Sequence, residues 1–274
     1  MRRILERLGV DAVELYFEMD GRFPNHHPDP TVVENLADLK EAVRRHGAEL
    51  GIAFDGDADR LGAIDENGEV VWGDQLMLIF AREILSRKPG AVFLGEVKCS
   101  QVMYDGIRAM GGQAIMYKTG HSLIKAKMKE VGAELAGEMS GHLFFKDRYF
   151  GYDDALYAAC RLMEIVAASG KPLSAQLAGV PKTVTTPEIR VDCPDDKKFE
   201  LVRVVCERFR ATHEISDIDG VRVKFGQGWG LLRASNTQPV LVMRFEATSP
   251  ERLEEYRATM TAALEEAKKQ VGVD

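Results

Sequence analysis

The sequence predicts an α/β fold with mixed, mainly parallel sheets and helices on both faces, plus a smaller C-terminal α+β domain. Between residues 74 and 169, short apolar runs alternate with longer segments whose apolar residues recur at helical spacing. Such alternation is typical of a parallel sheet that is covered by helices. After about residue 181, a helix, several consecutive strands and a final helix follow one another, which indicates a separate α+β domain.

The elements of the α/β part follow from periodicity and from turn residues. Val33, Leu36, Leu39 and Val43 have helical spacing, and Glu66-Asn67-Gly68 is a turn signal between two short apolar runs. The predicted helices are residues 32–46, 74–87, 99–110, 119–131 and 153–169. The predicted strands are residues 50–54, 62–65, 69–71, 91–94, 113–117 and 134–136.

The C-terminal part is predicted to begin with a β-rich run at residues 183–191. Its strands are expected at 214–218, 221–225, 229–234 and 240–248, and its helices at 195–212 and from the Ser249-Pro250 cap to about residue 270. We therefore divide the chain into three domains, at residues 1–68, 69–180 and 181–274. Residues 24–30 form a proline-rich extended linker, and residues 1–50 have few strands to pack on, so self-association through this region is expected.

Composition narrows the class of protein. Of 274 residues, 45% are apolar and 29% charged, as in a soluble globular protein, and the net charge of −7 argues against nucleic acid or an anionic membrane as partner. Cys99, Cys160, Cys193 and Cys206 include no close pair, which argues against a zinc site or a disulfide framework. With no signal-peptide core and no apolar run of membrane-spanning length, we expect a cytoplasmic location.

The most informative motif is the loop 55–60, which follows a short apolar run. Asp55, Asp57 and Asp59 would repel one another without a cation, and hard oxygen ligands favour Mg²⁺ or Ca²⁺. Arg60 indicates a phosphate nearby, because its guanidinium matches phosphate oxygens. An EF-hand is disfavoured since Arg60 stands where that loop requires glycine, and a merely solvated acidic turn is the plainer alternative.

Two further loops carry polar groups that suit a sugar phosphate. Glu138 and Ser140 alternate, so in an extended chain they face one side and could bracket sugar hydroxyls, although a plain surface turn is an open alternative. Residues 233–239 contain Arg233, Ser235, Asn236 and Thr237, which together can donate to phosphate oxygens. An ordinary β-turn is equally compatible with that segment.

Lys98 and His121 follow two predicted strands of the sheet. This is where open parallel sheets place their active sites. His121 could exchange protons near neutral pH, or it could simply cap the helix that follows. The pairs His121–Ser122 and Ser140–His142 are not read as nucleophile and base, because residues this close in sequence rarely reach that geometry.

These motifs, taken in order, resemble the α-D-phosphohexomutase family, and within it the phosphomannomutase/phosphoglucomutase branch. The resemblance extends over essentially the whole chain, with Ala58 where the metal loop more usually has glycine and with Met139 where the glucosamine branch usually has glutamine. It implies Mg²⁺ bound by Asp55, Asp57 and Asp59. It also implies a mannose or glucose 1- or 6-phosphate as substrate, whose phosphoryl group moves between C1 and C6 through a bisphosphate.

The resemblance also implies roles for the other motif residues. Arg60, Lys98 and His121 would lie near the reacting groups, and Glu138 and Ser140 would hold sugar hydroxyls. The non-transferring phosphate would be bound by Arg233, Ser235, Asn236 and Thr237.

One departure from the family pattern is large. The family's phosphoserine lies in a Thr-x-Ser-His-Asn-Pro-like loop, and residues 1–274 contain no such loop. The chain therefore resembles the C-terminal portion of a mutase, without the phosphoserine domain, and we expect no mutase activity from it alone. The alternatives are a non-catalytic sugar-phosphate-binding module, a phosphoglucosamine mutase and a Mg²⁺-dependent phosphatase.

Overall fold

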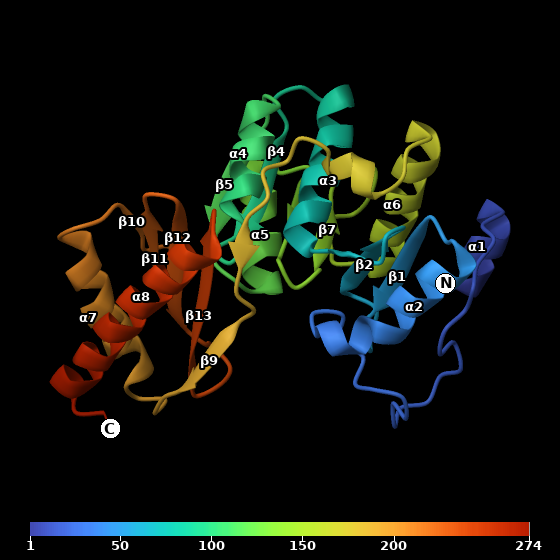
Figure 1. Ribbon diagram of the computed structural model, residues 1–274. Helices are drawn as coiled ribbons and strands as arrows, with labels where there is room; N and C mark the ends of the chain where they lie inside the picture. Colours follow the sequence, from blue (N-terminus) through green and yellow to red (C-terminus); the bar gives the residue numbers. More distant parts are fainter. Residues whose placement is uncertain (274) are drawn as a thin grey trace. The chain divides into compact units, whose positions relative to one another are not determined.

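The computed structural model describes residues 1–273 and divides them into two compact units (Figure 1). The first unit comprises residues 1–95, 103–115 and 120–180. The second comprises residues 181–273 together with two short segments, 96–102 and 116–119. The first unit has two sheets and the second has one, each with its own helices.

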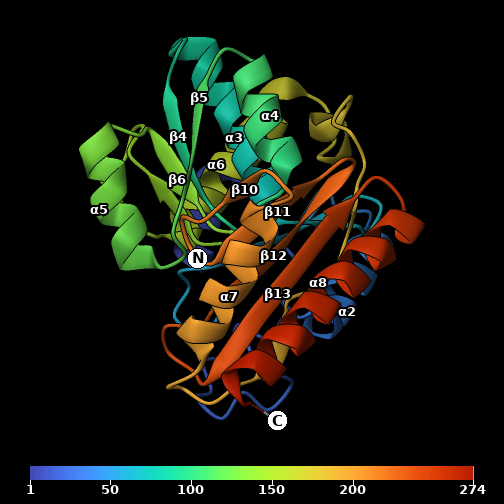
Figure 2. The same cartoon turned by 90° about the vertical axis from the view of Figure 1, so that its left-hand side faces the viewer.

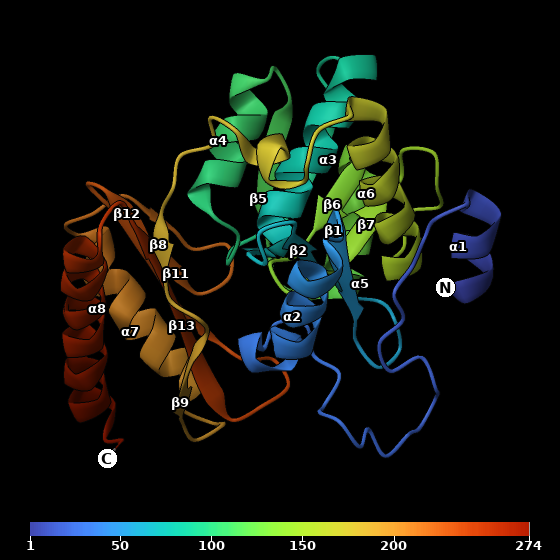
Figure 3. The same ribbon diagram turned by 45° about the vertical axis from the view of Figure 1, so that its right-hand side comes forward.

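The first unit contains a small antiparallel sheet in the order β1-β2-β3. Its strands are Leu50–Phe54, Leu61–Asp65 and Val70–Val71. The 3-10 helix η1 (Val33–Leu36) and helix α2 (Ala37–His46) precede this sheet, and α2 lies against β1 and β2 (Figure 3). Leu36, Val43 and Ile64 form their shared core, because the apolar side chains of α2 recur on one face.

A second sheet of the first unit has the order β5-β4-β6-β7. Strands β4 and β6 pair in parallel and β6 and β7 antiparallel, the strands being Val92–Glu96, Gln113–Tyr117, Leu135–Gly137 and Leu143–Phe145 for β4 to β7. The surrounding helices are α3 (Gly73–Arg87), α4 (Gln101–Ala109), α5 (His121–Val131) and α6 (Ala155–Ser169). Helix α3 is the most buried of these, as its nearly continuous apolar sequence requires. The 3-10 helix η2 (Ser174–Leu177) follows α6 and contacts α3.

The N-terminal segment is the most exposed part of the first unit. Helix α1 (Arg2–Leu8) is followed by residues 9–32, which contain no helix or strand. Leu8, Val13, Tyr16 and Met19 all expose half or more of their surface. Self-association through this segment stays a prediction.

The second unit is an antiparallel sheet covered by two helices. Its path is β10-β11-β12-β13-β8, with β9 also paired to β13, and its strands are Val184–Thr185, Ile189–Asp192, Ile215–Ser216, Val221–Phe225, Gly228–Ala234 and Val240–Ala247 for β8 to β13. Helices α7 (Lys198–Arg210) and α8 (Pro250–Val271) lie on the sheet (Figure 2). Leu201, Phe245 and Leu264 are among the fully buried side chains of their common core.

The predicted α/β class with an α+β C-terminal part is confirmed. The expectation of mainly parallel sheets is wrong: β4 and β6 pair in parallel, but the β1-β2-β3 sheet and the sheet of the second unit are antiparallel, because hairpin connections join most of their neighbouring strands. Some details differ from the expectation. Strand β7 and helix α1 were not predicted, and α4 begins at Gln101 rather than near residue 99, because Cys99 N–H closes a turn onto Glu96 O. The division at residues 68 and 180 stays a prediction. Within residues 1–273, no helix combines the length and the apolar character that crossing a bilayer would require.

Candidate functional site

The predicted metal loop, residues 55–60 and called the metal loop below, connects two antiparallel strands. Because Phe54 pairs with Leu61, the loop is the hairpin connection between β1 and β2. Asp55 Oδ1 accepts hydrogen bonds from the backbone N–H groups of Asp59 and Arg60, both at 3.0 Å. These two hydrogen bonds stabilise the loop in a closed turn around the Asp55 carboxylate. Ala58 has a φ of 60°, in the left-handed region that favours glycine.

The carboxylates of this loop are suitably placed to bind a cation. Asp55, Asp57 and Asp59 offer one oxygen each within 4.8 Å of one another. Burial raises the pKa of Asp55, and although its hydrogen bond from Arg60 opposes this, the charges of Asp59 and Asp57 raise it further. Repulsion of this kind is relieved by a divalent cation, and three carboxylates are a donor set that fits Mg²⁺.

Arg60 and the linker before the sheet lie against the same loop. The Arg60 Nε is 3.5 Å from Asp55 Oδ2, and its Nη1 is 4.0 Å from Asp29 Oδ2. A side chain at Gly62 would place its Cβ 2.6 Å from the Cβ of Pro30, so the linker can lie this close only because residue 62 is glycine. The proline-rich linker therefore supplies a second carboxylate, Asp29, near the guanidinium.

The predicted sugar loop, residues 138–142 and called the sugar loop below, is the hairpin connection between β6 and β7. Its ends are tied by a hydrogen bond from Glu138 N–H to His142 O, at 2.9 Å. Gly141 has a φ of 98°, and a Cβ there would lie 2.5 Å from Leu61 O. This close approach lets Leu61 N–H donate to Gly141 O at 3.0 Å.

The metal loop and the sugar loop are joined through their backbones. An isolated antiparallel bridge links Arg60 to His142, directly beside the Leu61–Gly141 hydrogen bond. The side chains follow the backbone, since the Nε–H of Arg60 donates to His142 Nε2 at 3.3 Å. Two loops that are about eighty residues apart in sequence thus form one continuous wall of the first unit.

His142 is the central residue of this wall. Its ring is buried, its Nδ1 lies 2.6 Å from Glu138 Oε2, and its Nε2 lies 3.1 Å from Asp59 Oδ1. Burial lowers the pKa of His142, but the hydrogen bond to Glu138 and the charges of Glu138 and Asp59 outweigh it, so the pKa lies above its ordinary value. Because Glu138 fixes the proton on Nδ1, the Nε2 atom is the one that can exchange a proton.

Sequence reasoning set His142 aside as a base for Ser140. The structure instead places Ser140 Oγ 3.3 Å from His142 Nδ1 and 3.4 Å from Glu138 Oε2, on the side of the ring away from Nε2. Glu138, Ser140 and His142 alternate along the chain, and the same period that predicted the first two to share a face also applies to the third. That alternation was the available signal for His142.

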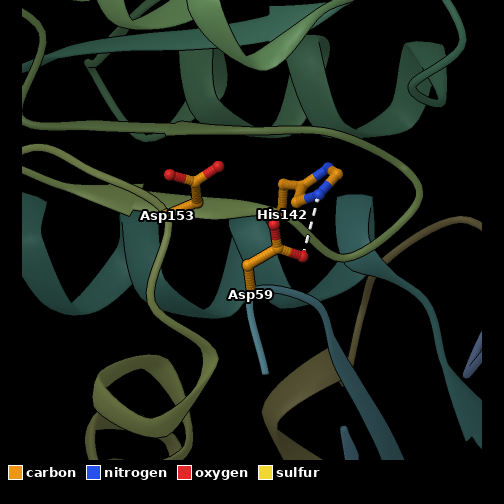
Figure 4. A group of neighbouring side chains, drawn as sticks. All are labelled: Asp59, His142 and Asp153. Carbon is orange, nitrogen blue, oxygen red and sulfur yellow. Dashed lines mark ion pairs between the residues drawn. The ribbon is translucent and has the colours of Figure 1, made fainter. Parts of the chain in front are cut away.

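Asp153 and His121 complete the group in the first unit. Figure 4 shows Asp59, His142 and Asp153 turned toward a common space, and one ligand atom from each lies within 4.8 Å of the others. Asp153 precedes helix α6, accepts from Lys125 Nζ at 3.0 Å, and lies 3.8 Å from the Nδ1 of His121. His121 is the first residue of α5 and is more than half exposed. The structure therefore brings His121 near Asp153, a residue that the sequence did not single out.

The other predicted site residues belong to the second unit. Lys98 is buried and its Nζ forms an ion pair with Glu188 Oε1 at 2.6 Å, while burial raises the pKa of Glu188 and the charge and hydrogen bond of Lys98 lower it below its ordinary value. Arg233 is buried at the end of β12 and pairs through Nε with Asp219 Oδ2 at 3.0 Å.

The predicted phosphate loop is a tight turn after β12. Ser235 Oγ accepts hydrogen bonds from the N–H groups of Thr237 and Gln238, at 3.3 and 3.2 Å, which closes the turn. Asn236 and Thr237 are exposed at its tip. The turn exposes the Asn236 amide and the Thr237 hydroxyl, whereas the backbone N–H groups of Thr237 and Gln238 are occupied by Ser235 Oγ.

Comparison with known proteins identifies the family. Residues 1–68 match the model for phosphoglucomutase/phosphomannomutase alpha/beta/alpha domain II, residues 72–184 that for domain III, and residues 188–263 that for the C-terminal domain. The chain belongs to the phosphoglucomutase/phosphomannomutase family.

Relatives agree with this family assignment. The chain is 46% identical over 263 residues to a phosphomannomutase/phosphoglucomutase of Pseudomonas aeruginosa, covering 96% of this chain and 57% of that protein. A crystal structure of a family member from Burkholderia thailandensis superposes with a TM-score of 0.88 at 46% identity, covering 97% of this chain and 57% of that one. The N-acetylphosphoglucosamine mutase of Aspergillus fumigatus, in complex with GlcNAc-6P and magnesium, shares the fold at 18% identity, with a TM-score of 0.59 over 79% of this chain and 48% of that one. The chain thus spans somewhat more than half the length of the curated relatives it matches.

Proposed function

We propose that this chain forms the metal-binding and sugar-phosphate-binding part of a hexose phosphate mutase. The reaction would move a phosphoryl group between the C1 and C6 oxygens of a glucose or mannose phosphate, through a bisphosphate. The observation that carries the proposal is the joining of the metal loop to the sugar loop, which places Asp59 beside His142 and His142 beside Glu138. Family membership at 46% identity supports the same activity.

The first unit would supply the metal ligands and the proton-handling groups. Asp55, Asp57 and Asp59 would hold Mg²⁺, which when bound stabilises the negative charge on the phosphoryl group during its transfer. Arg60 would contact the phosphoryl oxygens, because its terminal nitrogens donate no hydrogen bond within residues 1–273, while its Nε–H donates to His142.

The sugar hydroxyl that accepts the phosphoryl group must lose its proton. His142 Nε2 would take that proton, because the opposite nitrogen, Nδ1, is held by Glu138 at 2.6 Å and Nε2 is the nitrogen left to accept it. Glu138 and Ser140 would accept or donate hydrogen bonds to the sugar hydroxyls, and His121 would act as an electrostatic helper near Asp153.

The second unit would supply the phosphate grip. Arg233, Ser235, Asn236 and Thr237 would bind the phosphate that is not transferred, and Lys98 would stabilise negative charge near the reacting oxygens. Because Lys98 forms an ion pair with Glu188, its ammonium group would have to contact Glu188 and the substrate at the same time. Residues 1–274 contain no loop like the family's serine loop, so we expect no turnover from this chain alone.

The test is binding measured by calorimetry with Mg²⁺ present. The wild-type chain should bind glucose 1-phosphate and, more weakly, inorganic phosphate. Glu138→Gln should weaken the binding of glucose 1-phosphate about tenfold and leave the binding of inorganic phosphate unchanged, because only the contacts to the sugar hydroxyls are affected. Glu134→Gln is the matched control, since that carboxylate pairs with Lys88 away from the two loops.

Several outcomes would point elsewhere. Absence of any glucose 1-phosphate binding would refute the proposal. Release of inorganic phosphate from it would favour a Mg²⁺-dependent phosphatase, and tighter binding of glucosamine 1-phosphate would favour the glucosamine branch. A serine-bearing N-terminal portion from a relative can be added to test for conversion. If the chain then still binds the sugar phosphate without converting it, the non-catalytic sugar-phosphate-binding module is supported.

A further inference from the structure

Asp219, a residue outside every motif found in the sequence, lies directly behind Arg233. It is in the turn between β10 and β11, and its side chain is 13% exposed. The turn presses on β12, because a Cβ at the adjacent Gly220 would lie 2.3 Å from Leu232 O and 2.7 Å from the Cα of Arg233. Gly220 has a φ of 83°, so both space and backbone conformation require glycine there.

The contact between Asp219 and Arg233 uses only one edge of the guanidinium. Asp219 Oδ2 accepts from the Nε–H of Arg233 at 3.0 Å. The two terminal nitrogens of Arg233 have no hydrogen-bond partner among residues 1–273, and they are not sealed from solvent. The carboxylate therefore orients the side chain and leaves the two-pronged end available for an anion.

The same carboxylate oxygen binds a second segment of the second unit. Asp219 Oδ2 also accepts from the backbone N–H of Thr119 at 3.0 Å. The hydroxyl of Thr119 donates to Glu96 Oε2 at 2.9 Å, and that oxygen accepts from the backbone N–H of Lys98 at 2.7 Å. Glu96 is fully buried, so the hydrogen bonds that its carboxylate accepts are shielded from water.

We propose that Asp219 is a positioning residue that fixes the guanidinium of Arg233 for a phosphate and ties it to the segment of Thr119 and Lys98. The inference rests on the proposed function, in which Arg233 binds the phosphate that is not transferred. An arginine held at Nε loses less rotational freedom when an anion binds, which increases affinity. Two residues predicted separately, Arg233 and Lys98, are thus parts of one hydrogen-bonded network.

A competing effect has the opposite sign. A carboxylate beside Arg233 offsets part of its positive charge and would weaken the attraction for an anion. Charge removal alone therefore predicts that Asp219→Asn and Asp219→Ala both bind phosphate more tightly. Positioning predicts instead that Asp219→Ala binds more weakly and that Asp219→Asn, which can still accept both hydrogen bonds, largely retains affinity.

The experiment measures the affinity of the chain for inorganic phosphate and for glucose 1-phosphate by calorimetry. We expect Asp219→Ala to weaken both about tenfold, equivalent to roughly 1.4 kcal/mol, and Asp219→Asn to stay within about threefold of wild type. Asp217→Ala is the matched control, because Asp217 lies two residues away and pairs with Arg210 on the exposed surface. Equal or tighter binding by Asp219→Ala would overturn the proposal.

Arg233→Ala separates this inference from the function on which it rests. If Arg233→Ala binds both ligands as wild type does, the proposed phosphate role itself fails. If Arg233→Ala weakens binding and Asp219→Ala does not, only the positioning role fails. If Asp219→Ala folds poorly, NMR on the wild type still tests the pairing. The Nε–H proton of Arg233 should exchange slowly with water in the wild type and in Asp219→Asn. Fast exchange in the wild type would contradict the pairing.

Discussion

The strain at Ala58 gives a quantitative prediction about the metal loop. With a φ of 60°, Ala58 occupies the left-handed region, which costs a residue with a Cβ about 1–2 kcal/mol. Replacing it by glycine removes that cost but adds about 0.5–1 kcal/mol of backbone entropy lost on folding. We therefore expect Ala58→Gly to raise the free energy of unfolding by about 0.5–1 kcal/mol, and the melting temperature by about 1–4 °C.

Gly47 provides the matched control for this experiment. It ends helix α2 with a φ of 61°, and no heavy atom lies within 4 Å of the Cβ that alanine would add. Gly47→Ala therefore measures the cost of placing a residue with a Cβ in the left-handed region, with no steric clash added. It should lower the free energy of unfolding by about 1 kcal/mol. Calorimetry and urea unfolding measure both variants. Shifts of the same sign for Ala58→Gly and Gly47→Ala would refute the reasoning, as would a lower melting temperature for Ala58→Gly.

Two further predictions concern buried features of the first unit. Burial raises the pKa of Asp147, but its hydrogen bond to Arg87 and the nearby positive charges lower it to about 2, so its carboxylate stabilises the fold above the unfolded pKa and this contribution is lost as the pH falls through the folded value. Asp147→Asn should therefore lower the free energy of unfolding by about 2 kcal/mol at neutral pH, and it should make urea unfolding less dependent on pH in the acid range. Asp105→Asn, which removes a carboxylate from an exposed ion pair, should unfold as wild type does. Gly141→Ala should lose at least about 1–3 kcal/mol, because its φ is 98° and the new Cβ meets Leu61 O; thermal unfolding identical to wild type would contradict this.

Much of the fold could be predicted because its signals are local. Helix α3 shows as a continuous apolar segment between a turn and Pro89-Gly90, and the start of α8 follows from Ser249, whose side chain accepts from Arg252 N–H, and from Pro250. Strand β7 was not predicted, since Leu143–Phe145 is wholly apolar without alternation and returns along β6 as a hairpin, outside the strand–helix alternation that marked the other strands. Helix α1 lacks a side-chain cap and buries little apolar surface, so its sequence carries almost no signal.

The site was predictable by composition and less so by geometry. The carboxylates of the metal loop lie together because they are neighbours in sequence, which is why spacing alone could identify them. The contact of Arg60 with His142 arises from pairing between distant segments, and no local pattern encodes it. Asp153 and Asp219 are single acidic residues in ordinary turns, and only the folded chain shows what they contact.

The backbone bridge between Arg60 and His142 limits how members of this family can exchange parts. The family models divide the chain between residues 68 and 72, and the bridge joins residues on either side of that boundary. A chimera that took residues 1–68 from one relative and the following segment from another would have to recreate the fit of Gly141 against Leu61. These two segments should therefore be inherited together, so that both sides of the bridge come from one relative.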